Sequence, residues 1–295
     1  MNVYDETSQI LKTYRIQANK SLGQNFLVND EVVEKIIDSA ELEKDDLVIE
    51  IGPGLGVLTN RLLQKCNNVV CIELDERMIK ILKDRFKLYI DGTYLANLEI
   101  INEDVLKVNL EELIAEKRKE RNIKNVKFVA NLPYYISTPI IMKLLESRLS
   151  IDEIIVMVQK EVAERLTAKT GTRLAGAITY VVEYFSDATE IIRVPKESFI
   201  PSPKVESEVI KLEIRKAPKI SVEDEKFLFD LVQRSFTQRR KTLTNALVNY
   251  GYMKNKEEVE NMWKNLGMEA TVRGENLNLE QFAEIANYIK NRKAQ

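Results

Sequence analysis

Residues 47–56 read Leu-Val-Ile-Glu-Ile-Gly-Pro-Gly-Leu-Gly, an apolar run that leads directly into a glycine-rich turn. An amphipathic segment at 57–64 follows, so the pattern is strand, turn and helix. Glycine lets a backbone turn tightly and approach a ligand closely, and doubly wound sheets bind nucleotides at the carboxyl ends of their strands. A plain strand-to-helix connection also uses glycine. The stretch therefore predicts the first strand of an α/β sheet and a candidate nucleotide pocket.

From about residue 45 onward, short apolar runs alternate with longer amphipathic segments, which is typical of a parallel sheet covered by helices. We expect strands at 47–51, 69–73, 98–102, 126–130, 153–158 and 209–214. We expect helices at 57–64, 76–86, 110–118, 140–146 and 161–169. These segments predict an α/β, Rossmann-like, doubly wound sheet.

After Arg215 the strand pattern stops, and Lys216-Ala217-Pro218 is typical of a linker. The rest of the chain is helical in pattern, with helices expected at 222–235, 241–249, 256–266 and 279–291. We therefore expect two domains. Residues 1–215 form the sheet domain, in which 1–45 supply helices and a lid around Phe26, and residues 216–295 form a small all-helical domain.

The composition excludes several classes of function. The chain has 295 residues and no histidine, which removes the usual imidazole base, most zinc sites and any histidine-containing catalytic triad. No run approaches the roughly 18 consecutive apolar residues of a membrane helix, and the first residues are polar and acidic, unlike a signal peptide. We expect no metal, no membrane partner, a cytoplasmic location, and free thiols at Cys66 and Cys71.

Acids follow two further expected strands. Glu73 ends the second strand about 20 residues after the glycine turn, where an acid commonly accepts hydrogen bonds from ribose hydroxyls. Asp104 follows the third strand, where it can accept a hydrogen bond from an adenine amine. The G-x-G-x-G turn lacks the G-x-G-x-x-G spacing of dinucleotide enzymes, and Glu50 adds an acid where a diphosphate needs positive potential. The pattern favours a cationic sulfonium cofactor, S-adenosylmethionine.

The motif Asn131-Leu132-Pro133-Tyr134 follows the fourth expected strand. An adenine amine is a poor nucleophile because its lone pair is delocalised into the ring, and hydrogen-bond acceptors can pull it toward tetrahedral geometry. The Asn131 oxygen and a neighbouring carbonyl are suitable acceptors, while Tyr134 offers a stacking face worth about 1–3 kcal/mol. The methylated ammonium loses its proton to water, so no histidine is needed. A turn with two core tyrosines is the simpler alternative.

Six stretches of the sequence form a distinctive set of motifs, namely Gly23 to Leu27, Glu50 to Gly54, Asn131 to Tyr135, Gln159 to Val162, Phe199 to Val205 and Gln238 to Leu243. With these motifs the chain resembles the ribosomal RNA adenine dimethyltransferase family over almost its whole length. The resemblance implies a class I methyltransferase sheet that uses S-adenosylmethionine. It also implies dimethylation of two adjacent adenosines near the 3′ end of 16S rRNA, during assembly of the small ribosomal subunit.

The motifs and the resemblance together define the expected site. The catalytic loop is Asn131, Leu132, Pro133 and Tyr134. Cofactor contacts are expected at Gln24, Asn25, Leu27, Gly52, Gly54, Gly56, Glu73, Asp104 and Asn131. RNA contacts are expected at Tyr134, Phe199, Lys204, Arg234, Arg239, Arg240 and Lys241, and the resemblance implies that the two aromatic rings stack on the target adenine.

The basic residues in that last group explain how a chain of net charge −2 can bind RNA, because phosphate binding depends on where cations cluster. A basic run is also common on a plain solvated surface. We expect these cations to position phosphates of 16S rRNA in the immature small subunit, with the enzyme acting as a monomer.

Two alternatives stay open. A 23S rRNA adenine methyltransferase of the antibiotic-resistance type shares the fold and the chemistry, although Leu132 and the Gly-Pro-Gly-Leu-Gly turn favour the 16S enzyme. A non-catalytic RNA-binding assembly factor would retain the fold without turnover. The acids at three strand ends and the complete Asn-Leu-Pro-Tyr motif favour an enzyme.

Overall fold

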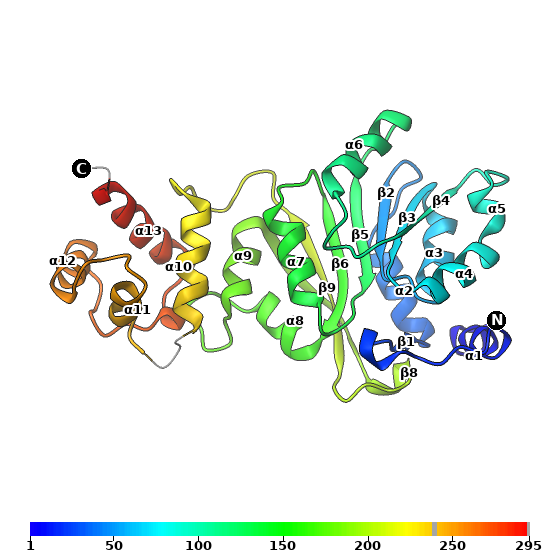
Figure 1. Ribbon diagram of the computed structural model, residues 1–295, viewed down its shortest axis with the longest axis horizontal. Coiled ribbons are helices and arrows are strands. Elements are labelled where there is room, and N and C mark those ends of the chain that lie inside the picture. The colour runs from blue at the N-terminus through cyan, green and yellow to red at the C-terminus, as the bar shows by residue number, and fades with distance from the viewer. Residues whose placement is uncertain (238–240, 294–295) are drawn as a thin grey trace. The chain divides into compact units, whose positions relative to one another are not determined.

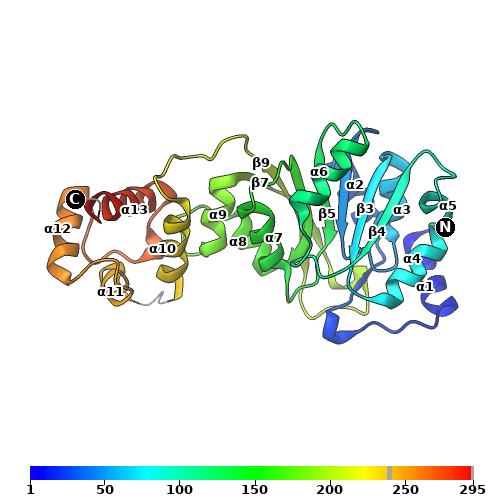
Figure 2. The ribbon, with the colours of Figure 1, turned by 45° about the horizontal axis from the view of Figure 1, so that its top comes forward.

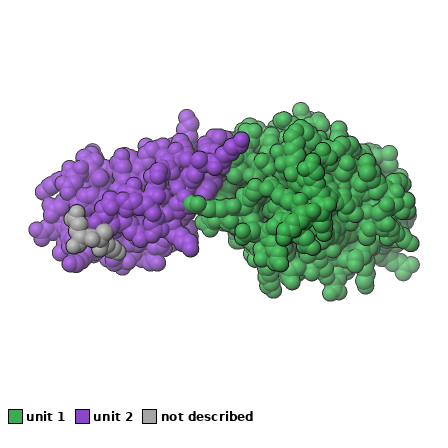
Figure 3. All heavy atoms as spheres, turned by 90° about the horizontal axis from the view of Figure 1, so that it is seen from above, with its two compact units in different colours: residues 1–163, 188–214 green, residues 164–187, 215–295 purple. Residues whose placement is uncertain are grey.

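The computed structural model describes residues 1–237 and 241–293, and the chain divides into two compact units (Figure 3). The first unit comprises Met1–Ala163 and Ala188–Ile214, and the second comprises Glu164–Asp187 and Arg215–Gln295. The sequence-based boundary after residue 215 places helix α9 (Ala177–Phe185) in the first domain. The structure instead groups α9 with the second unit, because it packs against α10 (Glu225–Thr237) and α13 (Leu279–Lys293).

A seven-stranded sheet forms the centre of the first unit, in the order β4-β3-β2-β5-β6-β9-β7. The strands are β2 (Leu47–Ile51), β3 (Asn68–Glu73), β4 (Asn97–Asn102), β5 (Val126–Asn131), β6 (Glu153–Gln159), β7 (Ser186–Val194) and β9 (Ser207–Ile214). Neighbours from β4 to β6 are parallel, and β9 is antiparallel to β6. The Rossmann-like α/β fold is confirmed. Strand order reverses between β2 and β5, where open α/β sheets bind ligands.

Helices cover both faces of this sheet. Those of the first unit are α2 (Asp30–Ser39), α3 (Val57–Lys65), α4 (Glu76–Arg85), α5 (Lys87–Ile90), α6 (Leu110–Glu120) and α7 (Ser137–Glu146), and α8 (Lys160–Thr167) follows β6. In Figures 1 and 2, α6 and α7 lie on one face, and α2 and α3 lie on the other. Helices α3, α4, α6 and α7 lie in the connections between parallel strands, and the helices on each face shield apolar side chains of the sheet from water.

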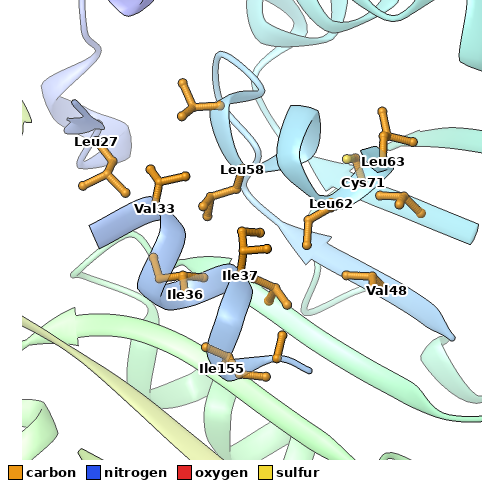
Figure 4. Close-up of a cluster of buried hydrophobic side chains, with 14 of the residues drawn as sticks. Leu27, Val33, Ile36, Ile37, Val48, Leu58, Leu62, Leu63, Cys71 and Ile155 are labelled. Atoms are coloured by element: carbon orange, nitrogen blue, oxygen red, sulfur yellow. The ribbon is translucent and has the colours of Figure 1, made fainter. Parts of the chain in front are cut away.

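The core beneath α2 shows how the sequence pattern becomes packing (Figure 4). Val33, Ile36 and Ile37 recur at the spacing of one helix face, and all three are buried. They point toward Leu58 on α3 and Ile155 on β6. Full burial of an aliphatic side chain of this size contributes about 1.5–3 kcal/mol. The cluster therefore fixes α2 and α3 on the sheet and positions the glycine turn at the start of α3.

The N-terminal segment runs along the carboxyl end of the sheet. It contains α1 (Val3–Thr13), the short helix η1 (Lys20–Leu22) and β1 (Phe26–Leu27). Strand β1 pairs antiparallel with β8 (Phe199–Ile200), which follows η2 (Lys196–Ser198). Arg85 donates hydrogen bonds to the carbonyl oxygen of Leu55 and to the carboxylate of Glu6. These contacts hold the segment beside the glycine turn.

The second unit is helical over its described residues after Ile214. Besides α9, α10 and α13 it contains α11 (Leu243–Asn249), α12 (Lys256–Leu266) and the short helix η3 (Gly274–Asn276). Tyr180 of α9 is buried against the ring of Phe282 and donates a hydrogen bond to the Leu277 carbonyl oxygen at 2.6 Å. Trp263 is also buried, and its Nε1–H donates to Thr244 Oγ1 at 2.9 Å.

Two further expectations concern the whole chain. Cys66 and Cys71 are both free and buried, as expected. Within residues 1–237 and 241–293, no helix has the length and apolar character that crossing a membrane requires.

Candidate active site

A cavity opens at the carboxyl end of the first unit's sheet, with about 850 Å³ of empty space that is partly open to solvent. It lies where β2, β3 and β5 end and the N-terminal segment crosses them. The sequence-predicted residues that line it are Gln24, Asn25, Leu27, Gly52, Gly54, Glu73, Asn131, Leu132, Pro133 and Tyr134. Residues far apart in the chain thus meet around one space.

The glycine turn and Glu73 form one wall. The backbone N–H of Gly54 donates to Glu73 Oε2 at 3.0 Å, and the N–H of Asp75 donates to Oε1 at 2.9 Å. Burial raises the pKa of Glu73, and these two backbone hydrogen bonds oppose the shift. Gly52 and Gly54 have φ values of +66° and +56°, a region that favours glycine. The turn therefore aims backbone and carboxylate together at the cavity.

Glu50 lies deeper in the same wall and is 1% exposed. Thr59 Oγ1 donates to its Oε2 at 2.6 Å, and the Cys71 thiol lies 3.5 Å from the same oxygen. Burial raises the pKa of Glu50 to about 7, and the hydrogen bonds from Thr59 and Cys71 oppose the shift. A buried acid at the cavity wall fits a ligand that carries positive charge, as a sulfonium cofactor does.

Asn131 ends β5 and is oriented by the segment that crosses it. Its Nδ2 donates to the Asn25 carbonyl oxygen at 3.3 Å, so its Oδ1 remains as an acceptor. The Pro133 carbonyl oxygen already accepts from the N–H of Ile136 at 3.2 Å. Among the described residues, no donor bonds to Asn131 Oδ1 or to the Leu132 carbonyl oxygen. The loop therefore presents two adjacent acceptors beside the cavity.

Tyr134 lines the cavity from the next position in the loop. Its hydroxyl lies 2.6 Å from Ser207 Oγ on β9, and its ring is half-buried. Burial raises the pKa of Tyr134, and the bond with Ser207 opposes the shift. The hydroxyl is therefore neutral near pH 7, and the ring presents an apolar face to the cavity.

Besides the expected RNA-binding cations, three sequence-predicted residues lie outside the cavity lining, namely Gly56, Asp104 and Phe199. A Cβ built on Gly56 would lie 2.6 Å from Phe86 Cε2, so this glycine permits α3 and α4 to pack closely. Asp104 Oδ1 accepts from the Leu106 N–H at 3.0 Å in the loop after β4. Phe199 is 3% exposed and belongs to the core cluster. The cofactor and RNA contacts of Gly56, Asp104 and Phe199 stay predictions.

The expected RNA-binding cations are distributed over both units. Lys204 is exposed in the first unit and Lys241 in the second. Arg234 donates to Asp230 at 2.7 Å and lies 5.1 Å above the Tyr250 ring, so part of its charge is already compensated. Arg239 and Arg240 lie outside the described residues. Phosphate binding by these cations stays a prediction.

Sequence reasoning did not include some residues that line the cavity. They are Leu22, Gly23, Pro53, Leu55, Val57, Leu58, Leu74 and Tyr135. Six of them are direct sequence neighbours of predicted site residues, which is a signal that could have included them: Gly23, Pro53, Leu55, Val57, Leu74 and Tyr135. Leu22 and Leu58 reach the cavity through the N-terminal segment and the start of α3.

The fold and the cavity together define a Rossmann-like methyltransferase, with the acid of the second strand bonded to a glycine turn and an Asn-Leu-Pro-Tyr loop on the same cavity. More specifically, the chain belongs to the ribosomal RNA adenine dimethylase family, whose model matches residues 15–291. It is an enzyme of this family, and its methyl donor is S-adenosylmethionine.

Related proteins match this chain over nearly its full length. The chain is 43% identical to ribosomal RNA small subunit methyltransferase A of Alkaliphilus metalliredigens (strain QYMF), over 96% of each chain. It is 45% identical to the protein of the same name from Lachnoclostridium phytofermentans, again over 96% of each.

Solved structures extend the comparison to the fold. A dimethyladenosine transferase from Plasmodium falciparum matches with a TM-score of 0.73 and 28% identity, over 91% of this chain and 98% of that one. The 23S rRNA methyltransferase ErmE matches with a TM-score of 0.64 and 24% identity, over 90% of this chain and 100% of that one. The ErmE likeness shows the shared fold alone.

Proposed function

We propose that this enzyme dimethylates the exocyclic amines of two adjacent adenosines near the 3′ end of 16S rRNA, in the immature small ribosomal subunit. It acts in the cytoplasm as a monomer. The relatives over 96% of the chain carry small-subunit names, which favours 16S rRNA over 23S rRNA. The observation that carries the chemistry is the pair of acceptors at Asn131 and Leu132 on the cavity that contains Glu73.

The two acceptors act on the target amine. Each of its two hydrogens is bound by one oxygen, Asn131 Oδ1 or the Leu132 carbonyl oxygen. This geometry draws the nitrogen lone pair out of conjugation with the ring and directs it along one line. Asn25 holds the Asn131 amide in the required orientation, because only the NH₂ group can donate to a carbonyl oxygen. The amine thereby becomes a nucleophile without a strong base.

The cofactor residues around the glycine turn hold the donor in the same cavity. S-adenosylmethionine supplies an electrophilic methyl group when it is bound. Glu73 accepts hydrogen bonds from the ribose hydroxyls with the carboxylate lone pairs that Gly54 and Asp75 leave free. Glu50 supplies negative charge for the cationic part of the cofactor. Asp104 accepts a hydrogen bond from the amine of the cofactor's own adenine. Water accepts the proton that the methylated nitrogen releases.

The direct experiment is methylation with labelled S-adenosylmethionine of free 16S rRNA, immature small subunits and 23S rRNA, each digested and analysed for dimethyladenosine. We expect product in the small-subunit substrates. Dimethyladenosine in 23S rRNA alone would support the resistance-type alternative. Absence of product, together with absent S-adenosylmethionine binding in calorimetry, would support a non-catalytic assembly factor.

Asn131→Ala tests the proposed acceptor. We expect loss of at least 100-fold in turnover, with S-adenosylmethionine affinity and thermal unfolding close to those of the unchanged protein, since a positioned polar group of this kind is worth about 2.7–4 kcal/mol in catalysis. Asn109→Ala is the matched control, because Asn109 caps α6 with the same amide chemistry outside the cavity lining. Near-normal turnover of Asn131→Ala would refute the role.

A further inference from the structure

Tyr135 is an exposed aromatic ring at the mouth of the cavity. It follows Tyr134 directly, lines the same cavity and is 57% exposed. Its hydroxyl has no hydrogen-bond partner among residues 1–237 and 241–293. The ring belongs to neither described core cluster that borders this region. Core packing therefore does not account for an aromatic side chain at this position.

The ring rests on the backbone of the N-terminal segment. A Cβ built on Gly23 would lie 3.3 Å from Tyr135 Cδ1 and 3.7 Å from Cε1, so the ring packs directly over this glycine. Gly23 is itself fixed, because its N–H donates to the Lys20 carbonyl oxygen at 3.1 Å and its carbonyl oxygen accepts from Asn25 Nδ2 at 3.0 Å. One part of the ring is thus supported while most of it faces solvent.

A target adenine that enters the cavity must leave the stack of bases in its RNA strand. The base beside it then loses a stacking partner, and an aromatic ring can replace that partner whatever the identity of the base. Tyr134 and Tyr135 are consecutive, so their Cα atoms are about 3.8 Å apart. Two consecutive rings, one half-buried in the cavity wall and one exposed at its mouth, match two consecutive nucleotides, one extruded and one left in the strand.

We propose that the ring of Tyr135 is the stacking platform for the unpaired base that flanks the target adenine. This subsite rests on the proposed function, since it needs an RNA strand with one adenine in the cavity. For adjacent adenosines, the flanking base in one of the two rounds of methylation is the second target. Tyr135 then holds the neighbouring adenosine next to the cavity while the first is modified.

The test combines protein variants with modified RNA. Binding is measured by fluorescence anisotropy for a short oligonucleotide with two adjacent adenosines and for copies that have an abasic site 5′ or 3′ of the target. We expect Tyr135→Ala to weaken RNA binding about 5- to 100-fold, which corresponds to the loss of one base stack. Tyr135→Phe and Tyr135→Trp should bind like the unchanged protein, because the ring and not the hydroxyl makes the contact.

The abasic RNA provides the decisive comparison. An abasic site at one of the two flanking positions should weaken RNA binding to the unchanged protein by the same factor as the Tyr135→Ala substitution does. The same abasic site should leave RNA binding to Tyr135→Ala unaffected. Tyr4→Ala is the matched control, since Tyr4 is 55% exposed on α1 and does not line the cavity. Equal losses for both proteins with each abasic RNA would overturn the proposal. So would a Tyr135→Ala variant that loses affinity for S-adenosylhomocysteine but not for RNA, because the ring would then only clamp the N-terminal segment.

Failure of the proposed function has a different signature. If the unchanged protein forms no dimethyladenosine in 16S rRNA, the proposed function falls. If the unchanged protein does form dimethyladenosine in 16S rRNA, but Tyr135→Ala binds and methylates RNA equally well, only the stacking platform is refuted.

Discussion

The Tyr134 hydroxyl lies 2.6 Å from the hydroxyl of Ser207, which is the first residue of β9. Ser207 is buried and pairs with Gln159 at the end of β6, so the antiparallel strand supports a ring that the loop after β5 presents. The ring is thereby held on two sides of the cavity wall, by its own loop and by a strand more than 70 positions further along the chain. In the proposed function this ring stacks on the target adenine, and a preformed stacking face needs less ordering when RNA binds.

We predict that Ser207→Ala raises the KM for RNA about 3- to 10-fold, since a neutral hydrogen bond contributes about 0.5–1.5 kcal/mol. Tyr134→Phe should have a similar effect, and the double variant should add little, because both changes remove the same bond. Affinity for S-adenosylmethionine should not change. Steady-state kinetics of the three variants provides the measurement. Effects that add fully in the double variant would show that the two hydroxyls act independently.

Gly56 gives a prediction about stability. It has φ +80°, and a Cβ there would lie 2.6 Å from Phe86 Cε2 and 2.8 Å from Leu82 Cδ2. Gly56→Ala should lower the free energy of unfolding by about 2–4 kcal/mol, from overpacking together with left-handed backbone strain. Gly92→Ala isolates the strain, because Gly92 has φ +72° and no atom within 4 Å of the built Cβ. It should cost about 1–2 kcal/mol in urea unfolding. Equal costs would contradict the packing role of Gly56.

The sequence alone predicts most strands of the sheet, but it does not predict every element of the fold. Strands β2, β3, β5 and β6 are mostly apolar because inner parallel strands are buried on both faces, whereas the edge strand β4 is only partly buried. Each expected strand is present. Helix α9 is not among the expected helices, since Ala177–Phe185 is a short, mostly apolar run rich in β-branched and aromatic residues, and pattern alone does not distinguish such a run from a buried strand. Strand β7 was also missed, and its burial does not alternate regularly.

The sequence also predicts only part of the candidate site. The glycine turn, Glu73 and Asn131 belong to compact motifs, so local sequence predicts them. Ser207 supports Tyr134 through a contact between elements that no local pattern encodes. Likewise, the exposure of Tyr135 depends on where the N-terminal segment crosses the sheet.

Lys143 on α7 holds the loop that carries Asp104. Its Nζ donates to the carbonyl oxygens of Val105, Leu106 and Val108 at 3.0, 2.8 and 2.8 Å. Burial lowers the pKa of Lys143, and the charge of Asp104 opposes the shift. Lys143→Met keeps the apolar stem but removes all three donors, so the loop loses its anchor.

We therefore predict that Lys143→Met weakens binding of S-adenosylmethionine about 5- to 20-fold in calorimetry, while kcat at saturating cofactor changes less than 3-fold, if Asp104 contacts the cofactor as expected. Lys117→Met is the control, because Lys117 on α6 forms ion pairs with Glu120 of the same helix and with Glu99 of β4, and not with the carbonyl oxygens of this loop. An unchanged dissociation constant for Lys143→Met would show that the loop after β4 is not part of the cofactor site.

Glu50 makes the protein's stability depend on pH. Burial raises its pKa in the folded chain to about 7, against 4.5 for the free side chain, so the folded state binds this proton more tightly than the unfolded state does. The stability that this proton contributes is fully present below about pH 4.5. It is lost as the pH rises through about 7.

Glu50→Gln keeps the shape of the side chain and has no proton to lose. The free energy of unfolding of Glu50→Gln relative to the unchanged protein should therefore increase between pH 5 and pH 8, by up to about 3 kcal/mol. Glu111→Gln, on an exposed position of α6, should show a constant difference over the same range. Urea unfolding at several pH values measures each difference, and parallel curves for Glu50→Gln would contradict the buried titration.

The same carboxyl links pH to the cofactor. A cationic ligand beside Glu50 favours its ionised form, so the affinity of the unchanged protein for S-adenosylmethionine should rise from pH 6 to pH 8. Glu50→Gln should bind more weakly at pH 8 and lose this dependence, because its amide stays neutral throughout. Calorimetry at pH 6, 7 and 8 distinguishes the two proteins. An affinity of the Gln variant that still rises with pH would assign the dependence to another group.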